Sequence, residues 1–540
     1  MIRASVVRTA AALVCASGLV ARADVTVDQA DSGKQCSAEA SAHADKGKRL
    51  ALVLAMDEAR QAFQRAATLD PQCPVVQWGL AVSNLPWPGA TPTRLAEARA
   101  RDELTRAGEA ATGLQRAHVQ ALTSLFEPAD EPFPRRRLAY RDALRRLVKA
   151  HPGDNEAVVW LAFAELALST VPGDEAAKRA AAVVGERFGG VPRVASAAFA
   201  LLLAIDDGAS PGDDAHRVAD VVARTAPAVP GPRHASARLY RELGLWEEAA
   251  RQDEVALGLV DALIDRRLMY GPGQQSFMPE SLLSSYTELG RFEDAAALVE
   301  RIEEALARPD EAPEPATVDR ARRGLAEMRV RLALERQDLT LGASLPRRLF
   351  ADQDLDLYWF ARGMSAARSA FPHQDQAAFA EAREAAAELE VLARAAGASS
   401  ESMRRWLLVR AAIAGGQYER DEMTVMLRQA QEIEGNLRAS GQLRQPLLWA
   451  EEVAGDLRLQ VDETGHARLH YVNLLAKQPR RARALLGLAR AERLRDQPAA
   501  AGAAYRRFLE VWGQADAGRP ELDEARTFLA EGAFGERALP

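Results

Sequence analysis

The strongest constraint on the fold is a short repeat near the C-terminus. One triplet of residues occurs twice with the same internal spacing: Ala467, Tyr471, Leu474 and Ala501, Tyr505, Phe508. A small residue followed by large residues four and seven positions later lies on one face of a helix, which is the stripe that packs on a neighbouring helix. The two copies are separated by the period of helix-hairpin repeats, about 34 residues, and such hairpins must stack because none can bury its apolar face alone. The spacing therefore predicts stacked helix pairs.

The composition of the chain agrees with helices and argues against sheet. Of 540 residues, 48% are hydrophobic but only 6% are aromatic, so the apolar mass is mainly aliphatic. Alanine and leucine favour helix, whereas strands are enriched in aromatic and β-branched residues. No strand-like alternation runs for more than a few residues. We therefore expect an all-α fold, an α-solenoid of the tetratricopeptide-repeat (TPR) kind with a sheet content near zero.

Two further hairpins in the middle of the chain resemble each other. The segment from Leu239 to Ala249 and the segment from Ser285 to Ala295 both carry Leu-Gly, then an aromatic residue, then two acids and an alanine. Gly244 and Gly290 would end one helix, and the acids would begin the next, where the helix dipole favours them. The two glycines are farther apart than one hairpin period, so these repeats contain insertions.

Two breaks are expected to interrupt the helices. Residues 308–316 are too rich in proline for a helix interior and predict a linker or a long loop. A second interruption is expected over 339–356. We therefore predict N-terminal TPR-like repeats over 24–307 and a C-terminal helical region over 317–540, with its repeats at about 445–512. The sequence leaves open whether the solenoid continues across 308–316.

The N-terminus has the order of a secretory signal peptide over residues 1–23. Arg3 and Arg8 precede an apolar run, which ends at the small residues Ala21 and Ala23. The run is about twelve residues long, whereas a span needs about twenty, and no later segment is long enough to cross a bilayer. We expect cleavage after Ala23 and a periplasmic or secreted protein.

Removal of this segment leaves two cysteines, Cys36 and Cys73. An even pair in an oxidising compartment predicts a disulfide. The alternative is two separate buried thiols.

The chain resembles a group of exported bacterial TPR proteins. The resemblance covers most of the mature chain and rests on these residues: Cys36-Ser37, Asp57-Glu58-Ala59, Phe63, Asp70-Pro71-Gln72-Cys73, Trp78-Gly79-Leu80-Ala81, His234, Leu243-Gly244-Leu245-Trp246, Leu289-Gly290-Arg291 and Phe508-Leu509-Glu510-Val511-Trp512. It implies an all-helical solenoid of largely unassigned role and independently supports the Cys36–Cys73 pair. Members carry additional histidines where this chain has approximately Pro230 and Phe277, so a metal or cofactor site built from those histidines is not expected here.

A solenoid of this kind presents a concave groove that binds a protein or peptide. We therefore expect a non-catalytic scaffold without a cofactor, and the sequence leaves its oligomeric state open. The candidate partner-binding residues lie on the first helices of hairpins or at their ends: Asn84, Glu165, Arg238, Arg241 and Tyr286. A net charge of -7 argues against a nucleic-acid partner. The short basic run Arg135–Arg137 is interpreted as the solvated start of a helix rather than as a phosphate site.

Two other functions remain open. His466 and His470 are one helical turn apart and could share a metal, with His234 as a further candidate, but the pair lacks an evident third ligand. A metal carrier or an enzyme is therefore the first alternative. A structural subunit of an envelope assembly is the second.

Overall fold

A computed structural model describes residues 36–85, 90–171, 173–206, 208, 214–226, 228–265, 278–307, 315–395, 397–443 and 445–537. The predicted signal peptide and most of the predicted linker, 308–314, lie outside these residues. The first twelve helices form the N-terminal half: α1 (Ala38–Ala51), α2 (Met56–Leu69), α3 (Pro74–Val82), α4 (Arg94–Ala110), α5 (Gly113–Phe126), α6 (Phe133–Ala150), α7 (Asn155–Leu166), α8 (Glu175–Phe188), α9 (Ala195–Asp206), α10 (Ala215–Thr225), α11 (Pro230–Glu242) and α12 (Trp246–Asp265).

The remaining helices form the C-terminal half: α13 (Met278–Glu288), α14 (Phe292–Ala307), α15 (Pro315–Glu335), α16 (Leu339–Ser344), α17 (Leu355–Ala370), α18 (Gln376–Arg394), α19 (Ser400–Gly416), α20 (Arg420–Ala439), α21 (Ala450–Gln460), α22 (Thr464–Lys477), α23 (Ala482–Leu494), α24 (Pro498–Val511) and α25 (Pro520–Arg537). Three short 3-10 helices, η3 (Arg347–Leu349), η4 (Asp352–Asp354) and η5 (Phe371–His373), complete the described secondary structure. The interruption predicted over 339–356 therefore contains one short helix and two single turns.

The helices pair as consecutive hairpins, and in most cases the first helix of a hairpin also packs on the first helix of the next, as α1 does on α3 and α19 on α21. Among the described residues no strand occurs, so the predicted all-α, TPR-like solenoid is confirmed. The six residues of the repeated triplet are fully buried on α22 and α24. The stack also continues beyond residue 307, because α15, which begins at Pro315, packs on both α13 and α14.

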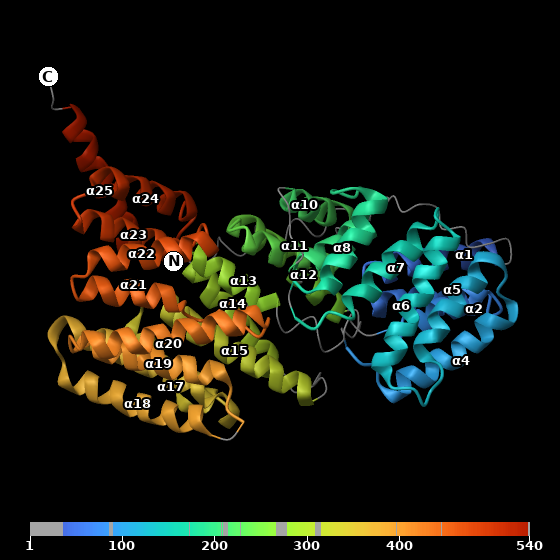
Figure 1. Ribbon diagram of the computed structural model, residues 1–540, viewed down its shortest axis with the longest axis horizontal. Helices are drawn as coiled ribbons and strands as arrows, with labels where there is room; N and C mark the ends of the chain where they lie inside the picture. Colours follow the sequence, from blue (N-terminus) through green and yellow to red (C-terminus); the bar gives the residue numbers. More distant parts are fainter. Residues whose placement is uncertain are drawn as a thin grey trace, which may run out of the picture.

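The C-terminal hairpins return to the middle of the chain. Figure 1 shows α21–α24 beside α13, although these helices are far apart in the sequence. Apolar residues of α12–α15 and of α22–α25 form a single buried cluster. A further buried cluster ends at Ala249, in α12, and belongs to the N-terminal half.

The two similar glycine turns explain part of this return. Gly244 and Gly290 both have a φ of +71°, a backbone conformation that favours glycine. A Cβ at Gly244 would lie 3.0 Å from the Arg480 Cβ, and one at Gly290 would lie 2.7 Å from the Ala515 Cβ. Each turn therefore ends a helix, as the sequence predicts, and also lets a loop of the C-terminal hairpins approach closely.

Hydrogen bonds fix these loops on the turns. The Trp246 indole N–H donates to the Arg480 carbonyl over 2.8 Å, and the Trp512 indole N–H donates to the Glu288 carbonyl over 3.1 Å. The Asp516 carboxylate accepts from the Glu293 amide at the start of α14 over 3.0 Å. No local sequence pattern indicates these contacts between distant segments.

At the N-terminal end, Cys36 and Cys73 form a disulfide with their sulfurs 2.00 Å apart. Cys36 lies just before α1, and Cys73 is the residue before α3. No helix among the described residues is long and apolar enough to cross a membrane.

Candidate functional site

Three inner helices of the N-terminal half, α3, α7 and α9, are buried along nearly their whole length. Every residue from Ala157 to Leu166 in α7, and from Ala195 to Ile205 in α9, is buried. Aromatic rings connect three of these helices. The centroids of Trp78 and Trp160 are 6.2 Å apart, and Phe163 lies 6.3 Å from Phe199. Side chains of the chain itself therefore cover these inner helices.

Two of the five predicted partner-binding residues, Asn84 and Glu165, lie at the ends of these inner helices and contact other side chains. The Asn84 amide donates to a Glu103 carboxylate oxygen over 2.8 Å. Glu165 has no exposed surface and accepts from Arg145 over 2.5 Å and from Arg179 over 2.9 Å. Both polar groups thus serve the packing of helices.

The other three lie around α11–α13. Arg238 pairs with Asp206 over 2.6 Å. Arg241 is 5% exposed and pairs with Asp253 over 2.6 Å, and the Tyr286 hydroxyl donates to a Glu254 oxygen over 2.9 Å. The structure therefore gives each predicted residue an internal partner, and it does not bring the five together in one place.

A buried cluster of charges holds the C-terminal hairpins on the central helices. Arg481, which precedes α23 and is 3% exposed, contacts three carboxylates from three helices. These are Glu288 at the end of α13, Glu335 at the end of α15 and Glu452 in α21. Arg483 adds a contact to Glu452 over 3.1 Å. One guanidinium therefore joins parts of the chain that are up to 193 residues apart.

The cluster changes the acidity of its members in opposite directions. Burial raises the pKa of Glu288 to about 7, against the opposing effect of the Arg481 charge. Burial alone would also raise the pKa of Glu452, but the charges of Arg481 and Arg483 outweigh it and the pKa is lowered. The two carboxylates differ because Glu452 faces the charges of two guanidinium groups, whereas Glu288 contacts one and also faces the Glu335 carboxylate, which raises its pKa.

The histidines of the metal hypothesis each have a carboxylate neighbour. His234 contacts Asp253 over 2.8 Å, His470 contacts Glu451 over 2.7 Å, and the weaker His466–Glu463 contact is 3.5 Å. His234 lies on α11, far in sequence from the pair on α22. Within the described ranges no three side chains of histidine, cysteine, aspartate or glutamate gather in a position that could hold a metal.

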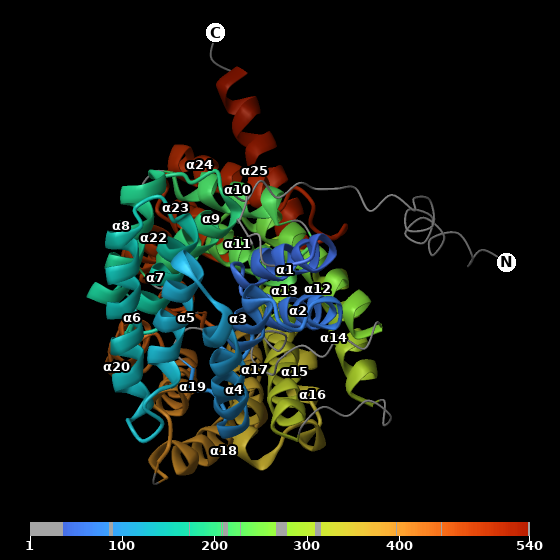
Figure 2. The same cartoon turned by 90° about the vertical axis from the view of Figure 1, so that its right-hand side faces the viewer.

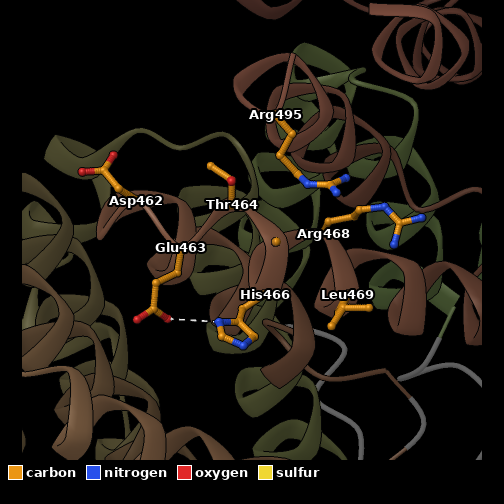
Figure 3. Close-up of a pocket in the computed structure, with 8 residues that line it drawn as sticks. Asp462, Glu463, Thr464, His466, Arg468, Leu469 and Arg495 are labelled. Atoms are coloured by element: carbon orange, nitrogen blue, oxygen red, sulfur yellow. Dashed lines mark ion pairs between the residues drawn. The ribbon is translucent and has the colours of Figure 1, made fainter. Parts of the chain in front are cut away.

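An open hollow of about 570 Å³ lies where the α21–α22 turn meets the end of α23. Its lining consists of eight residues: Asp462, Glu463, Thr464, Gly465, His466, Arg468, Leu469 and Arg495. Figure 3 shows Arg468 and Arg495 on one side of it, the Glu463–His466 pair on another, and Asp462 turned away. It opens to solvent between two consecutive hairpins.

Exposed apolar side chains accompany this hollow. Leu469 is 51% exposed and lines it, Leu494 is 59% exposed and precedes Arg495, and Val472 is 39% exposed on the same helix as Leu469. Leu469 and Val472 lie on the face of α22 opposite the buried repeat stripe. Apolar residues on the solvent-facing side of an amphipathic helix are the sequence signal that could have indicated this surface.

The two arginines of the hollow share one carboxylate. The Glu492 oxygens accept from Arg468 over 2.6 Å and from Arg495 over 2.8 Å, and Glu492 itself is 5% exposed. Two guanidinium groups over one buried carboxylate leave this side of the hollow with a positive charge. Its surface can therefore receive an apolar side chain beside an acidic group.

Comparison with known proteins assigns no family to the chain. No family model matches the chain, and no curated protein matches it. Among solved structures, the chain is similar to yeast Tom70 (13% identity, 92% of this chain and 96% of that chain, TM-score 0.34). It is also similar to IFIT1 (12%, 91% and 96%, TM-score 0.31) and to the TPR domain of P58(IPK) (14%, 92% and 99%, TM-score 0.20). At such scores the assignment as a helix-hairpin solenoid rests on the helix packing described above.

Proposed function

We propose that this protein is an exported, non-catalytic scaffold that binds a segment of a protein or peptide partner. The hollow on the C-terminal repeats, with Leu469 half exposed at its edge, is the observation that carries the proposal. Soluble proteins place large aliphatic side chains in exposed clusters mainly where another surface covers them.

The chemistry of the hollow defines the partner segment. Leu469, Val472 and Leu494 offer apolar contact, and the Arg468–Arg495 pair offers hydrogen-bond donors to a carboxylate. The partner would therefore present an apolar side chain next to an acidic one. We place binding at this hollow rather than at the five groove residues, because those five do not come together in one place, whereas the hollow joins charged groups to the exposed side chain of Leu469.

A photo-crosslinking amino acid at Leu469 tests the site in cells of the source organism. The matched control carries it at Val391 of α18, which is 69% exposed and distant in sequence from the hollow. We expect an adduct at Leu469 and none at Val391. The captured partner, once identified, should bind purified Leu469→Asp protein at least about tenfold more weakly than the unaltered protein. Equal adducts at both positions would remove the proposal.

We further propose that the mature chain starts at Asp24 and works in the periplasm or outside the cell. The charged, apolar and small-residue order of residues 1–23 supports this. N-terminal sequencing of protein from fractionated cells tests it, because an intact Met1 in the cytoplasmic fraction contradicts export.

A further inference from the structure

Helix α6 carries an unusual excess of positive charge for an acidic protein. It contains six arginines and one lysine but a single acid, Asp142. The run Arg135–Arg137 begins this helix as predicted, but only part of it is solvated. Arg136 is 4% exposed and pairs with Glu97 over 2.9 Å, whereas the Arg135 side chain is 77% exposed.

The outer face of α6 keeps this charge exposed. Arg146 and Lys149 are exposed, lie one turn apart, and form no ion pair with any described residue. Leu138, 42% exposed, lies on the same face. Arg145 lies beside them, and its nearest contact is Glu165, which is fully buried and is also bound by Arg179. Asp142 lies on this face as well and pairs with Arg141 over 2.7 Å and with Arg145 over 3.9 Å. The exposed positive charges still outnumber this one acid, so the outer face remains basic.

Helix α14 has the opposite character. It carries five acids and one arginine. Glu300 and Glu304 are exposed, lie one turn apart, and form no ion pair with the described part of the chain. Glu303, between them, pairs with Arg329 over 2.6 Å and is thus partly neutralised.

The two helices lie on opposite sides of the molecule. Figure 2, viewed along the long axis, shows α6 at one side beside α8 and α14 at the other side. They cannot meet within one molecule in this arrangement. Two pairs of free charges, each spaced by one helical turn and opposite in sign, therefore face outward in different directions.

We propose that the α6 face of one copy of this chain binds the α14 face of a second copy, in a head-to-tail contact. Arg146 and Lys149 of one molecule lie against Glu300 and Glu304 of the next, and Leu138 adds apolar contact. The contact joins two different surfaces and therefore leaves one of each free, so that copies add in a row. Because the attraction comes from exposed charges, it is weak and depends on salt.

Sedimentation velocity of the mature chain tests this over a range of concentrations. At about 20 mM salt we expect the mean sedimentation coefficient to rise with concentration, and at about 500 mM salt, where the Debye length falls below about 5 Å, we expect it to stay at the monomer value. Two charge reversals probe the faces separately: Arg146→Glu with Lys149→Glu, and Glu300→Lys with Glu304→Arg. Each double variant should associate at least about tenfold more weakly than the unaltered protein at low salt.

Mixing the two double variants is the decisive step. In the mixture, each contact between one variant and the other again joins opposite charges. Association should therefore return to within about threefold of the unaltered protein. The matched control reverses Glu384 and Glu388, an exposed pair one turn apart on α18, and should leave association unchanged. A monomer at every concentration in low salt overturns the proposal. So does a mixture that fails to associate, or a control that loses association to the same extent.

A membrane surface is a different partner for the same arginines. Vesicles containing about 30% anionic lipid should bind no better than neutral vesicles at physiological salt. Binding to the anionic vesicles that Arg146→Glu with Lys149→Glu removes, without self-association, would assign the α6 face to lipid and overturn the inference. Circular dichroism of all variants checks that they fold.

Discussion

The two ends of the solenoid use the same packing unit with different rings. In the N-terminal half, the Phe63 ring of α2 lies against Gly47 of α1 and Gly79 of α3. In the C-terminal half, the Tyr471 ring of α22 lies against Gly455 of α21 and Gly487 of α23. In both units the residue that carries the ring is equally far in sequence from its two glycines. This sequence distance is the same in the two units. One geometry, a ring inserted between the first helices of two hairpins, therefore recurs at both ends of the chain.

The difference between the rings reflects their surroundings. Phe63 is fully buried within an apolar cluster, and the inner wall of this half continues with the rings of Trp160 and Phe199. Tyr471 is equally buried, but its hydroxyl donates to Asp456 over 2.7 Å, and Asp456 in turn contacts Arg483 of the charge cluster. The C-terminal half thus adds buried charges to the same repeat. A repeat motif fixes helix spacing without fixing the polarity of the core.

Among substitutions that distinguish the two halves, replacing Arg481 by methionine should lower the free energy of unfolding the most. It leaves Glu288, Glu335 and Glu452 close together without their shared cation, and breaking a buried ion pair costs about 3 to 5 kcal/mol. We expect the free energy of unfolding of the C-terminal half to fall by this amount. Urea unfolding measures the loss of free energy of unfolding, and hydrogen exchange in each half shows which half is destabilised.

Arg490→Met is the matched control for that experiment. Arg490 also binds a glutamate, Glu524, over 2.6 Å, but both side chains are partly exposed. Its loss should cost about 0 to 1 kcal/mol. If both variants lose stability equally, burial of the Arg481 cluster has no special role. Faster exchange in α3 or α7 would show that the two halves do not respond separately.

Replacing the glycines beside the two rings by alanine should lower the free energy of unfolding by less than the Arg481 substitution does. The loss should be similar in the two halves. A Cβ at Gly79 would lie 2.1 Å from the Phe63 ring, and one at Gly487 would lie 2.3 Å from the Tyr471 ring. Overpacking of this kind costs about 2 to 3 kcal/mol. Gly435→Ala in α20, where no atom lies within 4 Å, should instead stabilise by about 0.5 to 1 kcal/mol. Thermal and urea unfolding of the three variants compare these values; a stabilised Gly79→Ala or Gly487→Ala variant contradicts the shared unit.

Exchanging the rings tests the difference in polarity directly. Phe63→Tyr buries a hydroxyl among apolar residues and should cost about 1 to 2 kcal/mol. Tyr471→Phe removes the hydrogen bond to Asp456. Because Asp456 keeps its ion pair with Arg483, the free energy of unfolding should fall by about 1 kcal/mol or less. Urea unfolding measures both variants. A tolerated tyrosine at position 63 would mean that the N-terminal core admits a water or a polar partner there.

The hairpin pattern was predictable from sequence because it depends on residues close together along the chain. The stripe through Tyr471 and Tyr505 has a period that only stacked helix pairs satisfy, and Gly244 and Gly290 end helices through a local backbone requirement. The structure confirms the all-α solenoid built from these elements. The local pattern, however, places Gly244 and Gly290 only within their own hairpins and does not indicate the C-terminal loops that pack on them.

The return of the C-terminal hairpins was not predictable, because no local pattern records it. Arg481 looks like any arginine before a helix, and its three glutamates are dispersed over three helices that are not consecutive in the chain. For the same reason, sequence reasoning could select Glu165 and Arg241 as polar residues on first helices but not see that both are buried in ion pairs. The hollow beside Leu469 needs the positions of two hairpins at once. Surfaces made by several repeats require the superhelix, which depends on many small packing angles.

The two halves should also differ in the pH dependence of their stability. Burial raises the pKa of Glu280 on α13 to about 8, with Glu327 raising it further and Arg331 and Arg323 opposing. A raised pKa means that the folded chain holds a proton which the unfolded chain has released, so this stability is present below about pH 4.5 and is lost as pH rises through 8. We expect the free energy of unfolding to fall by about 1 kcal/mol per unit between pH 6 and 8 through this group. Glu280→Gln should flatten that slope. In the N-terminal half, burial would raise the pKa of Asp154, but hydrogen bonds from His118 and from the backbone outweigh burial and lower it. The stability that this carboxylate contributes is present above about pH 3.8 and is lost as the pH falls further, so Asp154→Asn should lower the free energy of unfolding near neutral pH and lose this effect in acid. Urea unfolding at each pH tests both, and an unaltered slope in Glu280→Gln contradicts the assignment.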